Sequence, residues 1–366
     1  MPSVKEICRL IEGFAPPELQ ESYDNSGLLA GSPEAEATGA LICLDVTEDI
    51  VNEAIALGLN LIISHHPFIF GGIKQLTGSN ETQRIAIEAI KNNINIFAAH
   101  TNLDSAAGGV SIVMAQKLGL QHIKPLEPRK QSLLKLVTYV PTHHAEQVRN
   151  ALFAAGAGRI GKYDACSYNS EGYGTFCASE GAKPFVGKIG EVHYENEVRV
   201  ETVLPFYLRS AVEAALLKAH PYQEVAYDVY LLENKWNTTG FGATGELQEE
   251  METQSFLEKI KRTFNVPTFR HTNICKEKIK RVAVCGGAGS FLIKNAKAVA
   301  ADIFITGDIK YHDFFLADNQ LIIADIGHYE SEQYAKEIFY EIISKNLPNF
   351  AVQISEIKTN PVNYYF

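Results

Sequence analysis

Two adjacent histidines, His65 and His66, directly follow the apolar run LIIS and precede Pro67. The run predicts a short buried strand, and ligands of α/β sheets bind outside the carboxyl ends of the strands. Neutral imidazole is the commonest metal ligand among side chains. The pair is therefore a candidate for metal binding, and a pair of exposed loop histidines is the alternative that the pattern leaves open.

Two further predicted strands also end in imidazoles and carboxylates. His100 and Asp104 follow the apolar run INIFAA, and His328 and Glu332 follow the run LIIAD. The i, i+4 spacing of His328 and Glu332 places both side chains on one face of a helix. The alternative for Asp104 is a role in a turn or helix cap. The alternative for His328 and Glu332 is an ordinary pair on the protein surface.

Together the three strand ends supply three imidazoles and two carboxylates, or four imidazoles if His100 joins them. Imidazole with carboxylate suits Zn²⁺, Mn²⁺ or Fe²⁺ rather than a thiolate site. Five ligands are too many for one open catalytic metal, but they are enough for two metals if carboxylates bridge. Such a centre activates water as hydroxide and polarises a substrate oxygen, so we expect two divalent metal ions and hydrolytic chemistry.

Two glycine-containing segments carry weaker signals. The turn Cys285–Ser290 could cradle an anion at a helix N-terminus, but it lacks the Walker lysine, and a tight strand-to-helix turn is favoured. The segment Tyr23–Leu28 either lines the same crevice or forms only a turn, and the turn is favoured.

A polar segment also follows the predicted strand at residues 302–308. It offers Asp308, Lys310 and His312 as groups that support a metal ligand or exchange protons, with an ordinary polar loop as the alternative. We treat His100 and His312 as candidate proton shuttles.

The elements that must position these residues alternate between helix and strand. Apolar residues at helical spacing behind a Ser3 cap predict the first helix, and short apolar runs predict buried strands. Strands that alternate with helices in short units favour a mainly parallel sheet covered by helices on both faces. The predicted elements of this region are helices at 3–14, 48–60, 80–93 and 110–120 and strands at 39–47, 61–66 and 94–100.

The pattern changes near residue 127, where the chain is charged and carries a proline. The next hundred residues are arranged as β-α-loop-β-α-β, typical of an antiparallel sheet with helices on one side. A polar, Gly-rich segment at 233–247 marks a second boundary, and the α/β rhythm then returns. We therefore predict an α/β core of residues 1–128 and 240–366, interrupted by an inserted α+β domain at 129–239.

The composition disfavours several function classes. The 366 residues carry 33 Lys and Arg against 43 Asp and Glu, and a net charge of −10 disfavours nucleic acid as the main partner. We expect no signal peptide, and no window of about 18 apolar residues predicts a membrane span. Six cysteines without a CxxC pair favour reduced thiols and a cytoplasmic location.

Six motifs in a fixed order resemble those of the Nif-three-like family: ESYDNSGLL, ISHHPFIFGGIK, HTNLDSAAGGV, CGGAGS, TGDIKYHD and IGHYESE. The family is also described as a hexameric family with a dinuclear metal centre and as GTP cyclohydrolase I type-two homologues. The resemblance covers about residues 1–126 and 240–366. The segment between them, with GAGRIGKYDACSY, GAKPFVG and HPYQEVAYDVY, resembles the PII/CutA-like insert of the longer members.

The resemblance implies a two-lobed α/β core that carries a pair of metal ions. It implies that Asp104 and Glu332 are shared between the two ions, and that His100 lies beside them. The ligands of the family fall on five residues of this sequence: His65, His66, Asp104, His328 and Glu332.

The resemblance also implies a toroidal homohexamer whose metal sites face an internal cavity and whose openings are capped by the insert. The insert departs from the expected pattern near Cys177, where we expect a proline. This departure leaves the metal motifs untouched.

Two functions compete on this reading. The first is a metal-dependent hydrolase that uses a metal-activated water on a small molecule, with GTP cyclohydrolase-like chemistry on a nucleotide as one form. The alternative is a non-catalytic regulatory or metal-handling ring whose insert senses a small molecule. Nucleic-acid binding through the ring is disfavoured by the charge and by the lack of a basic and aromatic stripe.

Overall fold

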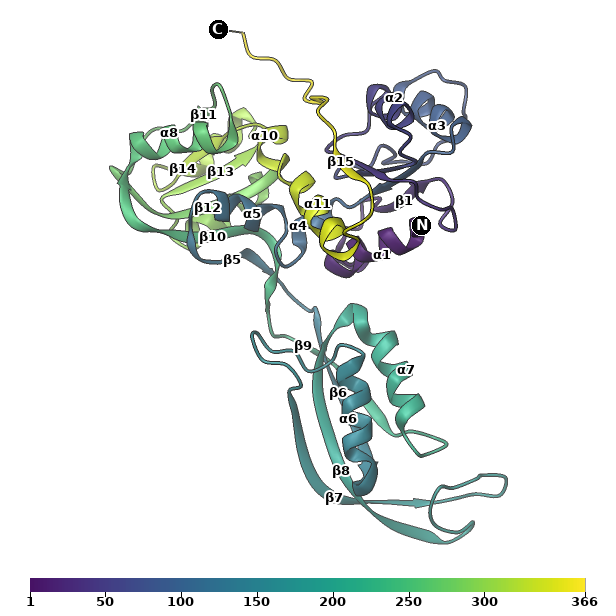
Figure 1. Ribbon diagram of the computed structural model, residues 1–366. Helices are drawn as coiled ribbons and strands as arrows, with labels where there is room; N and C mark the ends of the chain where they lie inside the picture. The colour runs from purple at the N-terminus through teal and green to yellow at the C-terminus, as the bar shows by residue number, and fades with distance from the viewer. Residues whose placement is uncertain (366) are drawn as a thin grey trace. The chain divides into compact units, whose positions relative to one another are not determined.

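The computed structural model describes residues 1–365 and has a mixed α/β fold (Figure 1). The chain divides into two compact units. The core unit consists of Met1–Pro128 and Thr238–Phe366, and the inserted unit is Arg129–Asn237. None of the helices within residues 1–365 combines the length and the apolar character that crossing a membrane requires.

The first sheet of the core unit has five strands in the order β1-β4-β3-β2-β15. Four of them are parallel, and β1 pairs antiparallel with β4 at the edge. All residues of β2, β3 and β4 are buried, as expected of a parallel sheet covered by helices. The strands are β1 (Gly27–Ala30), β2 (Ala40–Cys43), β3 (Leu61–Ser64), β4 (Asn95–Ala98) and β15 (Val352–Ile354).

Helices cover this sheet. Ile50 of α2 and Ile85 of α3 pack with Ile62 of β3, while α11 contacts β2, β15 and α1. The Ser3 cap predicted for α1 is confirmed, since its hydroxyl and Glu6 form a capping box. The helices are α1 (Val4–Phe14), α2 (Glu48–Leu57), α3 (Glu81–Lys91) and α11 (Ala335–Asn346).

The second sheet of the core unit has the order β11-β14-β13-β12-β10-β5. The three central strands β12, β13 and β14 are parallel, while β10 and β11 pair antiparallel with their neighbours. The predicted α/β core with sheets covered by helices is confirmed: the first sheet is mainly parallel, whereas the second is mixed, with β10 and β11 antiparallel on either side of its parallel centre. The strands are β5 (Gln121–Arg129), β10 (Trp236–Glu252), β11 (Arg270–His271), β12 (Lys278–Ala288), β13 (Ile303–Gly307) and β14 (Ile322–Asp325).

Helices cover both faces of the second sheet as well. Met114 of α5 and Phe256 of α8 pack on one face, and Ile293 of α9 packs with Phe304 on the other. The helices are α5 (Val110–Lys117), α8 (Thr253–Phe264) and α9 (Ile293–Ala298). Short helical segments complete the core unit: η1 (Pro17–Leu19), α4 (Thr101–Ser105), η4 (Ser290–Leu292), η5 (Tyr311–Ala317) and α10 (His328–Glu332).

The inserted unit is a four-stranded antiparallel sheet in the order β7-β8-β6-β9. Two helices, α6 and α7, lie on one face of it (Figure 1). Val148 and Val212 from these helices pack with Val198 and Val200 of β8. The elements are β6 (Leu133–Pro141), η2 (Thr142–His144), α6 (Ala145–Ala154), β7 (Ser167–Cys177), β8 (Val192–Pro205), η3 (Phe206–Leu208), α7 (Arg209–Ala219) and β9 (Tyr227–Leu232).

Two segments differ from the sequence prediction. The stretch expected to be a loop contains β7, which pairs with β8 along its whole length from Ser167 to Cys177. The segment at 233–247 contains the division between the two units at Asn237 and Thr238, but it also lies largely in β10, a strand that was not predicted and that pairs with β12. Both strands are rich in Gly, Ser and Thr, so pairing with a neighbouring strand, rather than an alternating apolar pattern, holds them in place.

Candidate metal centre

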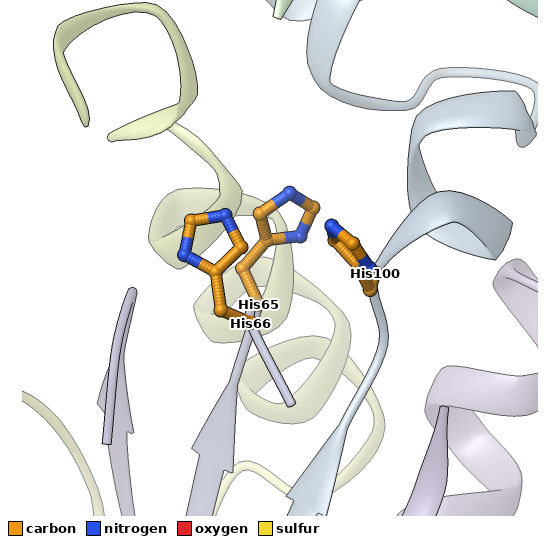
Figure 2. A group of neighbouring side chains, drawn as sticks. All are labelled: His65, His66 and His100. Atoms are coloured by element: carbon orange, nitrogen blue, oxygen red, sulfur yellow. The ribbon is translucent and has the colours of Figure 1, made fainter. Parts of the chain in front are cut away.

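The histidine pair stands where the chain leaves β3. The amide of His66 donates to the carbonyl of Leu44 at 2.9 Å, and the hydroxyl of Ser64 donates to the carbonyl of His66 at 2.8 Å. His100 follows the neighbouring strand β4, so the same sheet edge carries all three imidazoles. Figure 2 shows the three rings converging, with centroid separations of 5.0, 5.3 and 5.4 Å.

The second sheet supplies the fourth imidazole and a carboxylate. Strand β14 ends at Asp325, and α10 begins at His328 after Gly327. Gly327 has a φ of 97°, and a Cβ there would stand 2.2 Å from a carboxylate oxygen of Glu330. Glycine thus permits the sharp turn that starts α10 and places His328 and Glu332 one helical turn apart.

The first ligand group consists of His65, Asp104 and Glu332. Nδ1 of His65 donates to the carbonyl of Ala99 at 2.9 Å, which turns Nε2 toward the carboxylates. That Nε2 lies 3.6 Å from Oδ1 of Asp104 and 3.7 Å from Oε1 of Glu332. Nε2 of His65 and Oδ1 of Asp104 are buried and have no hydrogen-bond partner within the described residues.

The second ligand group consists of His66, His328 and Glu332. Oε2 of Glu332 lies 2.8 Å from Nε2 of His66 and 2.9 Å from Nε2 of His328. The two nitrogens lie 3.3 Å apart. Because Oε1 of Glu332 faces the first group and Oε2 faces the second, this buried carboxylate belongs to both.

Carboxylates outside the two groups orient the imidazole rings. Oδ1 of Asp45 accepts a hydrogen bond from Nδ1 of His66 at 2.7 Å, and Oδ2 of Asp308 accepts one from Nδ1 of His328 at 2.7 Å. Each bond leaves Nε2 of the ring facing Glu332. Such carboxylate–histidine pairs fix the tautomer and orientation of metal-binding imidazoles.

The Gly-rich turn after β12 makes room for the shared carboxylate. A Cβ at Gly287 would lie 2.1 Å from Oε1 of Glu332, and a Cβ at Gly286 would lie 3.2 Å from its Cγ. The amide of Gly287 donates to the hydroxyl of Ser331 at 2.9 Å, which joins the turn to α10. The sequence favoured a tight turn here but did not indicate that its glycines accommodate Glu332.

The ionisable groups of the centre have strongly shifted pKa values. Burial lowers the pKa of His66, but hydrogen bonds to two carboxylates outweigh it and raise the pKa to about 10. Burial also lowers the pKa of His328, but hydrogen bonds to Glu332 and Asp308 outweigh it and raise the pKa to about 9. Burial, with Glu332 nearby, raises the pKa of Asp104 to about 8. Burial also acts to raise the pKa of Glu332, but hydrogen bonds from the surrounding histidines hold it well below its ordinary value.

His100, a candidate proton shuttle, lies against the ligand groups. Its Nδ1 hydrogen bonds with Oδ1 of Asp24 at 2.8 Å, and one of its ring nitrogens lies within 4.8 Å of ring nitrogens of His65 and His66. Burial opposes ionisation of Asp24, but hydrogen bonds from His100 and Thr101 lower its pKa. An imidazole held by a carboxylate in this way is suited to proton transfer.

His312, the other candidate, lies elsewhere. It is exposed on η5, and its ring contacts those of Tyr311 and Phe315 at centroid distances of 5.2 and 6.3 Å. Among the described residues it belongs to none of the ligand groups. The structure thus brings His100 to the centre and leaves His312 outside it.

Two supporting carboxylates were not singled out from the sequence. Asp24 belongs to a segment interpreted as a turn, although its side chain holds His100. Asp45 lies within the strand predicted at 39–47, and its side chain orients His66. Their common signal is an acidic residue beside a buried strand, which becomes informative only when the neighbouring strands end in histidines.

The donor set fits divalent metal ions. Imidazole nitrogens and carboxylate oxygens converge from two sheets, and the two unpartnered buried atoms of His65 and Asp104 face one another. Buried polar atoms nearly always have hydrogen-bond partners. A cation bound between Nε2 of His65 and Oδ1 of Asp104, with Glu332 as a third ligand, would give both atoms the partner that they lack.

The chain is similar to known proteins over nearly its whole length. The model of the Duf34/NIF3 (NGG1p interacting factor 3) family matches residues 2–361. The GTP cyclohydrolase 1 type 2 homolog of Halalkalibacterium halodurans is 40% identical over 364 residues, which cover 98% of each chain. The homolog of the same name from Bacillus subtilis is 38% identical over 373 residues, again covering 98% of each chain.

Solved structures show the same extent of similarity. A Bacillus cereus protein related to NIF3 is 40% identical with a TM-score of 0.87, and the match covers 100% of this chain and 99% of that one. A Staphylococcus aureus protein is 30% identical with a TM-score of 0.78 over 100% and 99% of the two chains.

Proposed function

Because the chain belongs to the Duf34/NIF3 family and gathers imidazoles and carboxylates at one place, we propose that it is a metal-dependent hydrolase with a dinuclear centre. One observation carries the proposal. Oε1 of Glu332 faces Nε2 of His65, which is buried and has no hydrogen-bond partner among the described residues, while Oε2 faces Nε2 of both His66 and His328.

Each ligand group would hold one divalent ion. His65, Asp104 and Glu332 form one site, and His66, His328 and Glu332 form the other, with Glu332 shared. The family resemblance implies that Asp104 is shared as well, but it groups here only with His65 and Glu332, so we assign it to the first ion. Zn²⁺, Mn²⁺ and Fe²⁺ all suit this donor set, and bound ions of this kind lower the pKa of water and polarise a substrate oxygen.

The residues around the ligands have separate tasks. Asp45 and Asp308 hold the rings of His66 and His328, so that Nε2 of each is available as a ligand. His100, held by Asp24, is positioned to accept a proton from a water at the centre and to return it to a leaving group.

The substrate we propose is a small molecule. Relatives bear the name GTP cyclohydrolase 1 type 2 homolog, which makes GTP the first substrate to test. Opening a guanine ring requires hydroxide attack at an electron-poor carbon, which is chemistry that a dinuclear centre supports.

The experiment is a metal assay joined to an activity screen. The metal-loaded protein should hydrolyse a member of a panel of nucleotides, nucleosides and phosphoesters, and His65→Ala and Glu332→Ala should abolish turnover. His143→Ala, which replaces an exposed histidine of the inserted unit, is the matched control and should retain it. Metal-loaded protein that turns over nothing in the panel would reject the hydrolase.

We also propose that the chain assembles into a cytoplasmic homohexameric toroid, with Arg129–Asn237 as a PII/CutA-like module that caps its openings. The family resemblance supports this arrangement. Native mass spectrometry of the full chain should give six copies, and a monomer at micromolar concentration would reject the ring.

A second candidate function rests on a cavity of about 700 Å³ in the inserted unit. Tyr139, Phe176, Phe185 and Tyr222 line it, together with Glu197, which accepts a hydrogen bond from the hydroxyl of Tyr222 at 2.8 Å. This cavity favours a regulatory ring whose insert senses a small molecule. A small-molecule screen by thermal shift, in wild type and Tyr222→Ala, tests it, and the absence of any ligand sensitive to the substitution would reject the sensor.

A further inference from the structure

A cavity of about 880 Å³ opens beside the two ligand groups of the core unit. His66, His100 and His328 are part of its wall, so a molecule inside it would meet the metal centre directly. The volume is in the range of small-molecule sites. Aromatic rings contributed by both halves of the core unit line the rest: Phe68, Phe70, Phe269, Tyr329 and Tyr364.

Four carboxylates and one guanidinium line this cavity, together with the three imidazoles that face the metal centre. The single guanidinium, Arg270, pairs with Asp325 and donates to the carbonyl of Ile309 at 2.9 Å. Lys336 lies nearby with its ammonium 5.7 Å from the ring centre of Tyr329, but it is not among the lining residues. The lining carboxylates are Asp45, Asp308, Asp325 and Glu330.

This charge pattern is unsuited to a polyanion. Two divalent ions would be partly balanced by Asp104 and Glu332, which leaves little positive charge for phosphate groups beyond the first. Sites for polyphosphates supply several lysines, arginines or converging backbone amides. Here the one arginine already has a carboxylate partner.

We propose that the centre acts on an uncharged, flat heteroaromatic compound of nucleobase or nucleoside size, and that nucleoside triphosphates are poor ligands. That the compound is hydrolysed rests on the proposed hydrolytic function, whereas its binding in the cavity does not. Aromatic walls bind a flat ring through area burial and stacking. Each lining carboxylate already accepts a hydrogen bond from the protein, and its remaining lone pairs would accept hydrogen bonds from ring N–H and amino groups.

Guanosine and GTP form a matched pair of probes, because they share one ring system and differ in the triphosphate. Each is titrated calorimetrically into the metal-loaded full chain at low salt, and the metal content is measured afterwards because GTP itself binds metals. Guanosine should bind at least tenfold more tightly than GTP. Tighter binding of GTP, or no binding of guanosine at millimolar concentration, would overturn the proposal.

Removal of one lining charge tests the electrostatic cause. Glu330→Gln should reduce the preference for guanosine roughly threefold, whereas Glu258→Gln, at an exposed position of α8 outside the cavity, should leave it unchanged. In the wild type, raising the salt concentration should also narrow the preference, because salt screens the repulsion. A preference that neither the Glu330 variant nor salt alters would overturn the electrostatic argument.

The two proposals fail in different ways. Tight guanosine binding without any turnover would reject the hydrolase and keep the ligand class. If the protein hydrolyses GTP and binds it more tightly than guanosine, the proposed hydrolytic function would stand and the proposal of an uncharged ligand would be rejected.

Discussion

Gly287 offers a way to move Glu332 without replacing any ligand. Its φ is 61°, so an alanine there takes a left-handed conformation at a cost of about 1–2 kcal/mol. The new Cβ would stand 2.1 Å from Oε1 of Glu332, and the two groups must separate by at least about 1.3 Å to reach ordinary contact near 3.4 Å. Displacing a group that positions a metal ligand costs about 10- to 100-fold in metal affinity. We therefore predict that Gly287→Ala weakens metal binding by about that factor.

Gly58→Ala is the matched control. Gly58 ends α2 with a φ of 69°, and a Cβ there would have no heavy atom within 4 Å. Both variants should lose similar free energy of unfolding in urea because they share the backbone strain. Only the Gly287 variant should lose affinity for Zn²⁺ in competition with a chromophoric chelator. A folded Gly287→Ala protein that binds Zn²⁺ as tightly as wild type would refute the reasoning.

Three further predictions concern the groups around the ligands. Asp45→Asn should weaken Zn²⁺ binding about 10- to 100-fold in the same competition assay, because the ring of His66 loses its orienting carboxylate; unchanged affinity would contradict this role. In the folded, metal-free protein, three groups have raised pKa values: about 10 for His66, about 9 for His328 and about 8 for Asp104. Each of them therefore keeps its proton at pH values where the unfolded chain has already released it. The free energy of unfolding should therefore fall as pH rises from about 6.5 to 9, and saturating Zn²⁺ should remove the decline; stability that rises over this range in urea titrations would be the opposite result. His312→Ala should keep metal content and kcat within about twofold of wild type, and a loss above tenfold in kcat would restore it as a proton shuttle.

The strand-end residues could be predicted from the sequence because of a general property of parallel sheets. Apolar runs identified β3 and β4, and the carboxyl ends of neighbouring parallel strands meet at one edge, which brings His65, His66 and His100 together. The helical spacing of His328 and Glu332 likewise placed both side chains on one face of α10.

Contacts between the two sheets could not be predicted from local pattern. His66 and Glu332 are 266 positions apart, and their 2.8 Å contact depends on how two separate sheets pack. The role of Gly287 is also non-local, since it depends on a carboxylate from α10. Asp45 carries no signal of its own until His66 is known to lie beside it.

The missed strands have a different cause. Most residues of β7 are exposed and none is buried, so it lacks the apolar alternation by which a half-buried strand is recognised. Strand β10 contains Gly240, whose φ is 152° and whose Cβ would meet the backbone of Glu127. Another segment of the chain approaches the backbone closely there, so only glycine fits. In the sequence alone, such a glycine indicates only a turn.

The number of metal ions per chain tests the central claim most directly. The purified full chain is loaded with Zn²⁺, freed of unbound metal and measured by inductively coupled plasma mass spectrometry against protein concentration. We predict two ions per chain in wild type and in Glu258→Gln, and fewer than one in Glu332→Gln, because Glu332 serves both groups. One ion or none in the wild type, or two ions retained in Glu332→Gln, would contradict a dinuclear centre that shares this carboxylate.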